Sequence, residues 1–172
     1  MESSLLFPPA YTVYVDLVKS SSLNKALKTS MKKFYKTAKK IREKHANYRY
    51  ADDKWTIVQL LQHIIDAERV FVYRALTFSR NDQTELPGFD ENAWADSTVH
   101  STRSIKDLLK ELVMVRQSTI AFFDSLTDEE LARSGKANGN PMNVIGLGYV
   151  AAGHLVHHLN ILNNRYLTEL NK

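Results

Sequence analysis

Four long stretches of the chain carry apolar residues at intervals of three and four, which is the spacing of one face of an α-helix. These stretches predict helices near residues 23–44, 56–80, 104–125 and 141–168. No stretch shows the strict alternation of apolar and polar residues that a half-buried strand requires. The pattern therefore predicts an all-α fold, and four amphipathic helices of this length are typical of a four-helix bundle.

Helix-capping residues support these boundaries. A polar side chain before the first turn, with an acid or amide three residues later, satisfies backbone N–H groups that the start of a helix leaves free. Proline is favoured at the first helical position. Such signals precede three of the four helices: Thr56 with Gln59, Ser104 with Asp107, and Asn140 followed by Pro141. Thr127 with Glu130 predicts a further short helix that ends near Arg133.

The connection between the second and third helices, residues 81–103, is too long for a tight antiparallel turn. We therefore expect a crossover that passes over one end of the bundle. Phe89 and Trp94 are expected to fix it to the bundle. Asp90 and Glu91 are expected to serve in capping and in the structure of this loop rather than in a binding site.

The length and composition of the chain indicate an ordinary globular protein. Its 172 residues are most simply one domain, residues 1–172, with residues 1–22 as an irregular N-terminal arm. The beginning of the sequence lacks the basic and apolar regions of a signal peptide, and no apolar run approaches the ~18 residues of a membrane span. We therefore expect a cytoplasmic protein with no membrane partner.

The net charge of +4 raises the question of nucleic-acid binding, because many lysines lie in residues 25–44. An apolar stripe runs through the same segment, however, and the lysines mostly fill the remaining positions. A solvated helix face explains this arrangement better than a phosphate-binding surface, so no nucleic-acid partner is expected. The stripe consists of Leu23, Leu27, Phe34, Ala38 and Ile41.

Three of the six histidines lie in the last predicted helix. At ~100° per residue, His154 and His158 point the same way, one turn apart on the buried stripe, whereas His157 falls on the flank. His63 lies at the edge of the apolar stripe of the second helix. Gly146, Gly148 and Gly153 are expected to allow another helix to approach closely or to leave space beside the histidines.

Buried imidazoles need partners, because burying a polar group without one costs free energy. Hydrogen bonds to backbone carbonyls are one solution, and a shared metal ion is another, since two histidines at i and i+4 can converge on one ion. The chain has no cysteine, so such an ion would be bound by histidine, carboxylate or water. Zinc, nickel and ferrous iron all accept imidazole.

Four motifs in the chain resemble those of the DinB/YfiT superfamily of metal-binding four-helix bundles, in its DinB-like branch. They are KWTI at 54–57, His63 followed by DAER at 66–69, PGFDE at 87–91, and GHLVHHLN at 153–160. The resemblance extends from about residue 14 to about residue 167. It implies a divalent metal bound by His63, His154 and His158, and it implies a homodimer.

The same resemblance implies a thiol S-transferase that uses bacillithiol, mycothiol or glutathione on a small electrophilic substrate. A divalent metal would stabilise the thiolate of such a low-molecular-weight thiol, which fits a chain without cysteine. Two alternatives stay open: a metal-dependent hydrolase, and a non-catalytic dimeric module that binds a small molecule. Asp66, three residues after His63, is a candidate acid or base, although a polar flank residue is the simpler interpretation.

Overall fold

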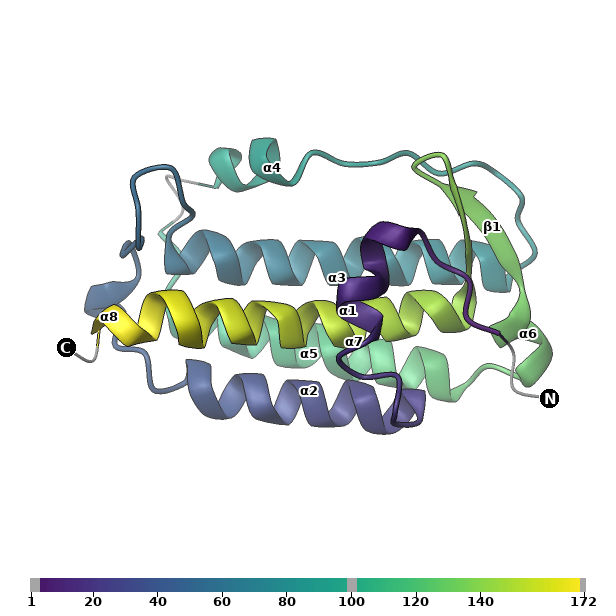
Figure 1. Cartoon of the computed structure of the whole chain (residues 1–172), viewed down its shortest axis with the longest axis horizontal. Coiled ribbons are helices and arrows are strands. Elements are labelled where there is room, and N and C mark those ends of the chain that lie inside the picture. Colours follow the sequence, from purple (N-terminus) through teal and green to yellow (C-terminus); the bar gives the residue numbers. More distant parts are fainter. Residues whose placement is uncertain (1–3, 99–101, 171–172) are drawn as a thin grey trace.

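Four long helices form the body of the computed structural model, which describes residues 4–98 and 102–170 (Figure 1). Their number and order agree with the predicted all-α four-helix bundle, to which the structure adds one small sheet. The four helices are α2 (Leu23–Ala38), α3 (Ile57–Ser79), α5 (Ile105–Asp124) and α7 (Val144–Ile161).

The predicted apolar stripes are the faces that these helices bury against one another. α7 packs against α2 and α3, and α5 packs against the same two helices from the other side. In α2, the predicted stripe lies inward or half-buried while the lysines are exposed, as expected for a solvated helix face. Thr56 and Gln59 form the predicted capping box at the start of α3, and Thr127 and Glu130 form one at the start of α6 (Asp128–Ala132).

The crossover runs back along the side of the bundle, so the expectation that it passes over one end was wrong. Figure 1 shows that α3 and α5 point in the same direction, which requires the chain to return along the length of α3 between them. The returning segment contains α4 (Glu91–Ser97). It is held by backbone hydrogen bonds of Leu86 and by a bond from Gln59 Nε2 to the carbonyl of Ala95 at 3.0 Å.

The two aromatic residues of the crossover do not share the anchoring role that was expected of them. Trp94 is 43% exposed and lies against Phe89, with 4.8 Å between ring centroids. Phe89 is half-buried and packs on the core. The buried anchors are instead Leu86, whose backbone is bonded to the hairpin residues Lys136 and Asn138, and Ala95, whose carbonyl is bonded to Gln59 of α3.

A β-hairpin precedes α7, so the predicted helix start at Asn140 and Pro141 was wrong. Strand β1 (Ser134–Ala137) pairs antiparallel with β2 (Asn140–Asn143). The two residues between them, Asn138 and Gly139, have φ values of 50° and 74°. An Asn-Gly pair adopts this left-handed backbone readily and favours a tight hairpin. The helix therefore begins later, where Asn143 Oδ1 accepts a hydrogen bond from Gly146 N at 2.9 Å.

The first helix of the bundle is shorter than predicted, because the chain leaves α2 after Ala38. Ile41 still reaches the core, which explains why its periodicity extended the predicted helix. A short 3₁₀ helix, η2 (Glu43–His45), follows. The carboxylate of Glu43 accepts hydrogen bonds from the backbone N–H groups of Ile105 and Lys106, so this segment caps the start of α5.

The N-terminal arm lies across α7 and contains two short helices, η1 (Pro9–Tyr11) and α1 (Thr12–Val15) (Figure 1). Gly153 of α7 makes this contact possible, since a Cβ there would lie 2.1 Å from the carbonyl oxygen of Tyr14. The predicted close approach at the glycines is thus confirmed at Gly153, with the arm as the approaching element.

The last helix continues beyond α7 through a π-helical segment, η3 (Leu162–Leu167), into α8 (Thr168–Leu170). Tyr166 of η3 is buried and donates a hydrogen bond to the carbonyl of Trp55 at 2.7 Å. Within residues 4–98 and 102–170, no helix combines the length and the apolar character that crossing a membrane requires.

A buried ion pair joins all four long helices at the centre of the bundle. Arg116 of α5 binds both carboxylate oxygens of Glu68 of α3 at 2.7 Å, and both side chains are almost fully buried. Arg116 also donates to Leu27 O and Ser30 Oγ of α2 and to Ala151 O of α7. The sequence pattern did not reveal this pair, because a charged residue on an apolar face is normally a surface residue.

Candidate metal centre

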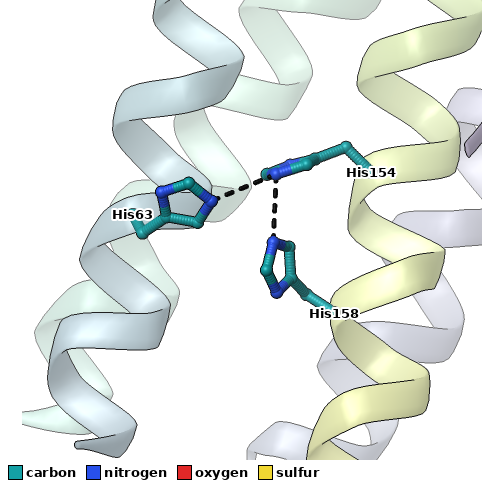
Figure 2. Close-up of side chains that lie close together, drawn as sticks. All are labelled: His63, His154 and His158. Carbon is teal, nitrogen blue, oxygen red and sulfur yellow. Dashed lines mark hydrogen bonds between the residues drawn. The ribbon is translucent and has the colours of Figure 1, made fainter. Parts of the chain in front are cut away.

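Three histidine side chains from two adjacent helices meet at one point. His154 and His158 lie one turn apart on α7, and His63 faces them from α3 (Figure 2). Nε2 of His154 lies 3.1 Å from Nε2 of His63 and 3.0 Å from Nε2 of His158. The helix faces deduced from the sequence thus bring together the three predicted residues.

The surroundings keep these imidazoles neutral. Burial, with a smaller contribution from the neighbouring His157, lowers the pKa of His63 to about 4. Burial also holds the pKa values of His154 and His158 well below the usual range of histidine, with added repulsion from the neighbouring histidines. Neutral imidazole is the form that binds a metal ion, so all three rings are ready to act as ligands at neutral pH.

Hydrogen bonds among the three rings cannot satisfy them all. A neutral imidazole nitrogen has either one N–H or one lone pair, so Nε2 of His154 makes only one good hydrogen bond with its two neighbours. In addition, Nδ1 of His158 is buried without a hydrogen-bond partner among the described residues. A cation between the three nitrogens would use every Nε2 lone pair at once.

The spacing of the nitrogens fits a metal ion. Metal–nitrogen bonds of about 2.05 Å in tetrahedral geometry place ligand nitrogens about 3.3 Å apart. The two Nε2 separations, 3.0 and 3.1 Å, lie close to that value, and one ligand atom from each of the three residues falls within 4.8 Å of the others. Among the described residues, this is the group of histidines and acids whose ligand atoms converge in this way.

Aromatic rings pack around the histidines and fix their orientation. The ring centroid of Trp55 lies 4.6 Å from that of His63. The ring centroids of Tyr14 and Phe71 lie 5.3 and 5.5 Å from that of His154. Tyr14 belongs to the N-terminal arm, which therefore forms part of the site. No periodic pattern in residues 1–22 indicated this contribution, so the arm was expected to be irregular.

A cavity of about 330 Å³ opens beside the three histidines. Its volume is that of a site for a small molecule. The wall combines residues of the arm, α3, the crossover, the hairpin and α7. It is formed by Tyr11, Tyr14, Trp55, His63, Ala67, Phe71, Arg74, Phe89, Glu91, Asn138, His154 and His158.

Other residues singled out in the sequence lie apart from the three nitrogens. His157 is half-buried on the flank of α7, where its ring packs against Tyr14. Asp66 accepts a hydrogen bond from Gln62 and lies beside Arg69, and it is not among the residues that line the histidine cavity. Burial raises the pKa of Asp66. Its role as an acid or base stays a prediction.

The structure places two residues in the cavity wall that the sequence did not assign to it, Glu91 of α4 and Arg74 of α3. Asp90 caps α4 as expected, whereas Glu91 lines the cavity from the exposed side of that helix. Arg74 was overlooked as a cavity residue. The only available signal was its position on α3, where residues 63, 67, 71 and 74 follow one another at intervals of three and four.

Known proteins resemble this chain in sequence. The family model of the DinB superfamily matches residues 26–162. A protein of Oceanobacillus iheyensis, OB0413, whose name provisionally classes it as a metal-dependent hydrolase, is 25% identical over 138 residues. That alignment covers 78% of this chain and 78% of the relative.

Two solved structures from Bacillus subtilis share the fold. YfiT, described as a probable metal-dependent hydrolase with an unusual four-helix bundle topology, superposes with a TM-score of 0.75 at 16% identity, covering 95% of this chain and 94% of YfiT. The DinB-like protein YjoA gives a TM-score of 0.63 at 20% identity, covering 88% of this chain and 93% of YjoA. With the match to the family model across most of its length, the chain belongs to the DinB superfamily.

Proposed function

We propose that His63, His154 and His158 bind one divalent metal ion and that the adjacent cavity admits a small-molecule substrate to it. The observation that carries this proposal is the convergence of three neutral imidazole nitrogens beside a cavity of about 330 Å³. The names of OB0413 and YfiT, both of which refer to metal dependence, support it. Zinc, nickel and ferrous iron are all suitable for this donor set.

Three protein ligands leave a coordination position free, which is typical of a reactive site rather than a purely structural one. When bound, a divalent ion supplies Lewis-acid chemistry and lowers the pKa of a water or thiol beside it. The chain's own residues would orient the reaction. Trp55, Tyr14 and Phe71 pack on the ligand rings and exclude water from one side of them.

Thiol transfer is our first candidate for the reaction. The sulfur of an external low-molecular-weight thiol would attack an electrophilic carbon of the substrate and displace a leaving group. The carbon–sulfur bond forms, the bond to the leaving group breaks and its electron pair departs with that group, and the thiol proton passes to solvent. Two features favour it: the chain has no cysteine of its own, and its motifs resemble those of DinB-like thiol transferases. The mechanism also needs no acid or base in the cavity wall, where Glu91 is the only carboxylate among the described lining residues.

Hydrolysis is the second candidate, and the names of OB0413 and YfiT favour it. Water would take the place of the thiol as nucleophile. A proton acceptor would then be useful, and Glu91 lines the cavity whereas Asp66 does not. A binding module without catalysis is the third possibility left by the sequence.

One set of assays separates these three functions. The protein is loaded in turn with zinc, nickel or ferrous iron and incubated with a panel of electrophiles and esters, with and without glutathione. Thiol-dependent consumption of an electrophile, lost in His154→Ala, is the result we expect. Product formation without thiol would indicate a hydrolase. Saturable binding of substrates with no turnover under any condition would contradict both catalytic proposals.

A further inference from the structure

The guanidinium of Arg74 of α3 is buried, with few hydrogen-bond partners and no counter-charge among the described residues. Arg74 is 2% exposed, and its only hydrogen bond among the described residues runs from Nη2 to the carbonyl of Pro87, at 2.9 Å. Nη1 is buried without a hydrogen-bond partner, and none of the described carboxylates lies within ion-pair distance. A buried charge without a partner costs several kcal/mol, so the position calls for an explanation.

Arg116 is a second buried arginine of this fold, and its hydrogen bonds are those of a residue with a purely structural role. Its guanidinium makes five hydrogen bonds, two of them to the carboxylate of Glu68. Arg116 therefore has a counter-charge and full hydrogen bonding, whereas Arg74 has neither. The contrast indicates that the partner of Arg74 is not part of the chain.

Arg74 lines the same cavity as the three histidines. It follows His63 by eleven positions on one face of α3, which corresponds to about 16 Å along the helix axis between their Cα atoms. Phe71 and Phe89 line the wall as well. Among the described lining residues, Arg74 is the one with a permanent positive charge, while Glu91 contributes a carboxylate from the exposed side of α4.

We propose that Arg74 binds a carboxylate group of the substrate, at the end of the cavity away from the histidines. The substrate would be an elongated monocarboxylic acid with an apolar middle that packs on Phe71 and Phe89. A carboxylate matches the donor geometry of a guanidinium. A dianion is disfavoured by Glu91. The assignment of the other end to the histidines rests on the proposed metal-dependent function, but the contact at Arg74 does not require a metal.

The test is calorimetric binding of a matched acid and amide, phenylpropanoate and phenylpropanamide, to chelator-treated, metal-free protein at neutral pH. Wild type should bind the acid more tightly than the amide. Arg74→Gln should weaken the affinity for the acid by about tenfold or more and change the affinity for the amide by less than about twofold. The reason is that a hydrogen-bonded charge pair is lost only with the acid. Arg80→Gln, at an exposed arginine directly after the end of α3, should leave both affinities unchanged.

Two further variants sharpen the result. Glu91→Gln should strengthen binding of the acid, because it removes a like charge from the cavity. Arg74→Lys keeps the charge and should preserve a preference for the acid even if the Gln variant does not fold. Equal affinity of wild type for acid and amide would overturn the proposal. Equal weakening of both ligands in Arg74→Gln would also overturn it, since that outcome indicates that Arg74 only holds the crossover through Pro87.

The same titration separates this proposal from the proposed metal site. His154→Ala should lose metal but keep its preference for the acid over the amide. A metal site that fails to bind any ion would therefore leave the result at Arg74 intact, and failure at Arg74 would leave metal binding by the histidines intact.

Discussion

At the scale of single residues, the position of a side chain on its helix explains which residues the sequence could identify. His154 and His158 were identifiable because a spacing of four places them on one face, and that face was marked as buried by its apolar neighbours. Arg74 was not, because the carboxylate that we propose as its partner comes from the substrate. Arg116 was not either, because its burial depends on partners far away in the sequence. Glu68 precedes Arg116 by 48 positions.

The depressed pKa values of the histidines predict an acid-sensitive fold. An unfolded histidine has a pKa near 6.5, whereas burial lowers that of His63 to about 4 in the folded protein. Between these values the unfolded state binds more protons, so the free energy of unfolding of the metal-free protein should fall as pH falls from about 6.5 to about 4. The loss from His63 alone is about 3 kcal/mol.

Urea unfolding at a series of pH values, with a chelator present, measures this loss. His63→Gln should show a shallower decline than wild type. A free energy of unfolding that stays constant across the window would show that the folded histidines titrate like unfolded ones.

Gly153 offers a second test at the residue scale. An alanine there would place its Cβ 2.1 Å from Tyr14 O, so Gly153→Ala should displace the N-terminal arm from α7. Hydrogen exchange should accelerate in α1. Gly148→Ala is the control, because the atoms nearest to its Cβ belong to side chains, those of Leu23 and Phe123, which can move more easily than backbone. If Gly153→Ala instead stabilised the protein by about 1 kcal/mol, as helix propensity alone would predict, the proposed steric role would be wrong.

At the scale of elements, the buried pair of Glu68 and Arg116 determines how four helices fit together. Arg116→Leu leaves the Glu68 carboxylate buried without its partner and should lower the free energy of unfolding by about 3–5 kcal/mol. Arg69→Leu removes a half-exposed arginine from a surface ion pair and should cost no more than about 1 kcal/mol.

The double variant Glu68→Leu, Arg116→Leu distinguishes a charge effect from a packing effect. It should recover part of the stability lost in Arg116→Leu, since no unpaired charge remains. Urea unfolding of wild type, Arg69→Leu, Arg116→Leu and the double variant gives the comparison. A double variant less stable than Arg116→Leu by the full cost of a second mutation would mean that the two side chains act independently.

Elements were predictable where a local signal determined them. Thr56 with Gln59 and Thr127 with Glu130 marked helix starts that the structure confirms, because a capping box needs only residues near in sequence. The hairpin was missed although Asn138 and Gly139 carry its turn signal. Its strands are only four residues each and too short for an alternating pattern to stand out.

At the scale of the whole molecule, the sequence indicated a four-helix bundle but not the relative direction of α3 and α5. The length of the crossover excluded a tight turn between α3 and α5. It did not distinguish a connection over one end from one that returns along the side, because that choice depends on tertiary contacts such as those of Leu86 with the hairpin. The predicted homodimer stays a prediction, and sedimentation at high micromolar concentration tests it.

The central claim is that three particular histidines bind one metal ion, and the metal content of four variants tests it most directly. The proteins are purified without a nickel column, and their metal is measured by mass spectrometry. His63→Ala, His154→Ala and His158→Ala should each lose most of the metal, because two imidazoles cannot complete the protein side of the site. His157→Ala should retain metal near the wild-type level. Loss of metal in His157→Ala with retention in His154→Ala would contradict the account.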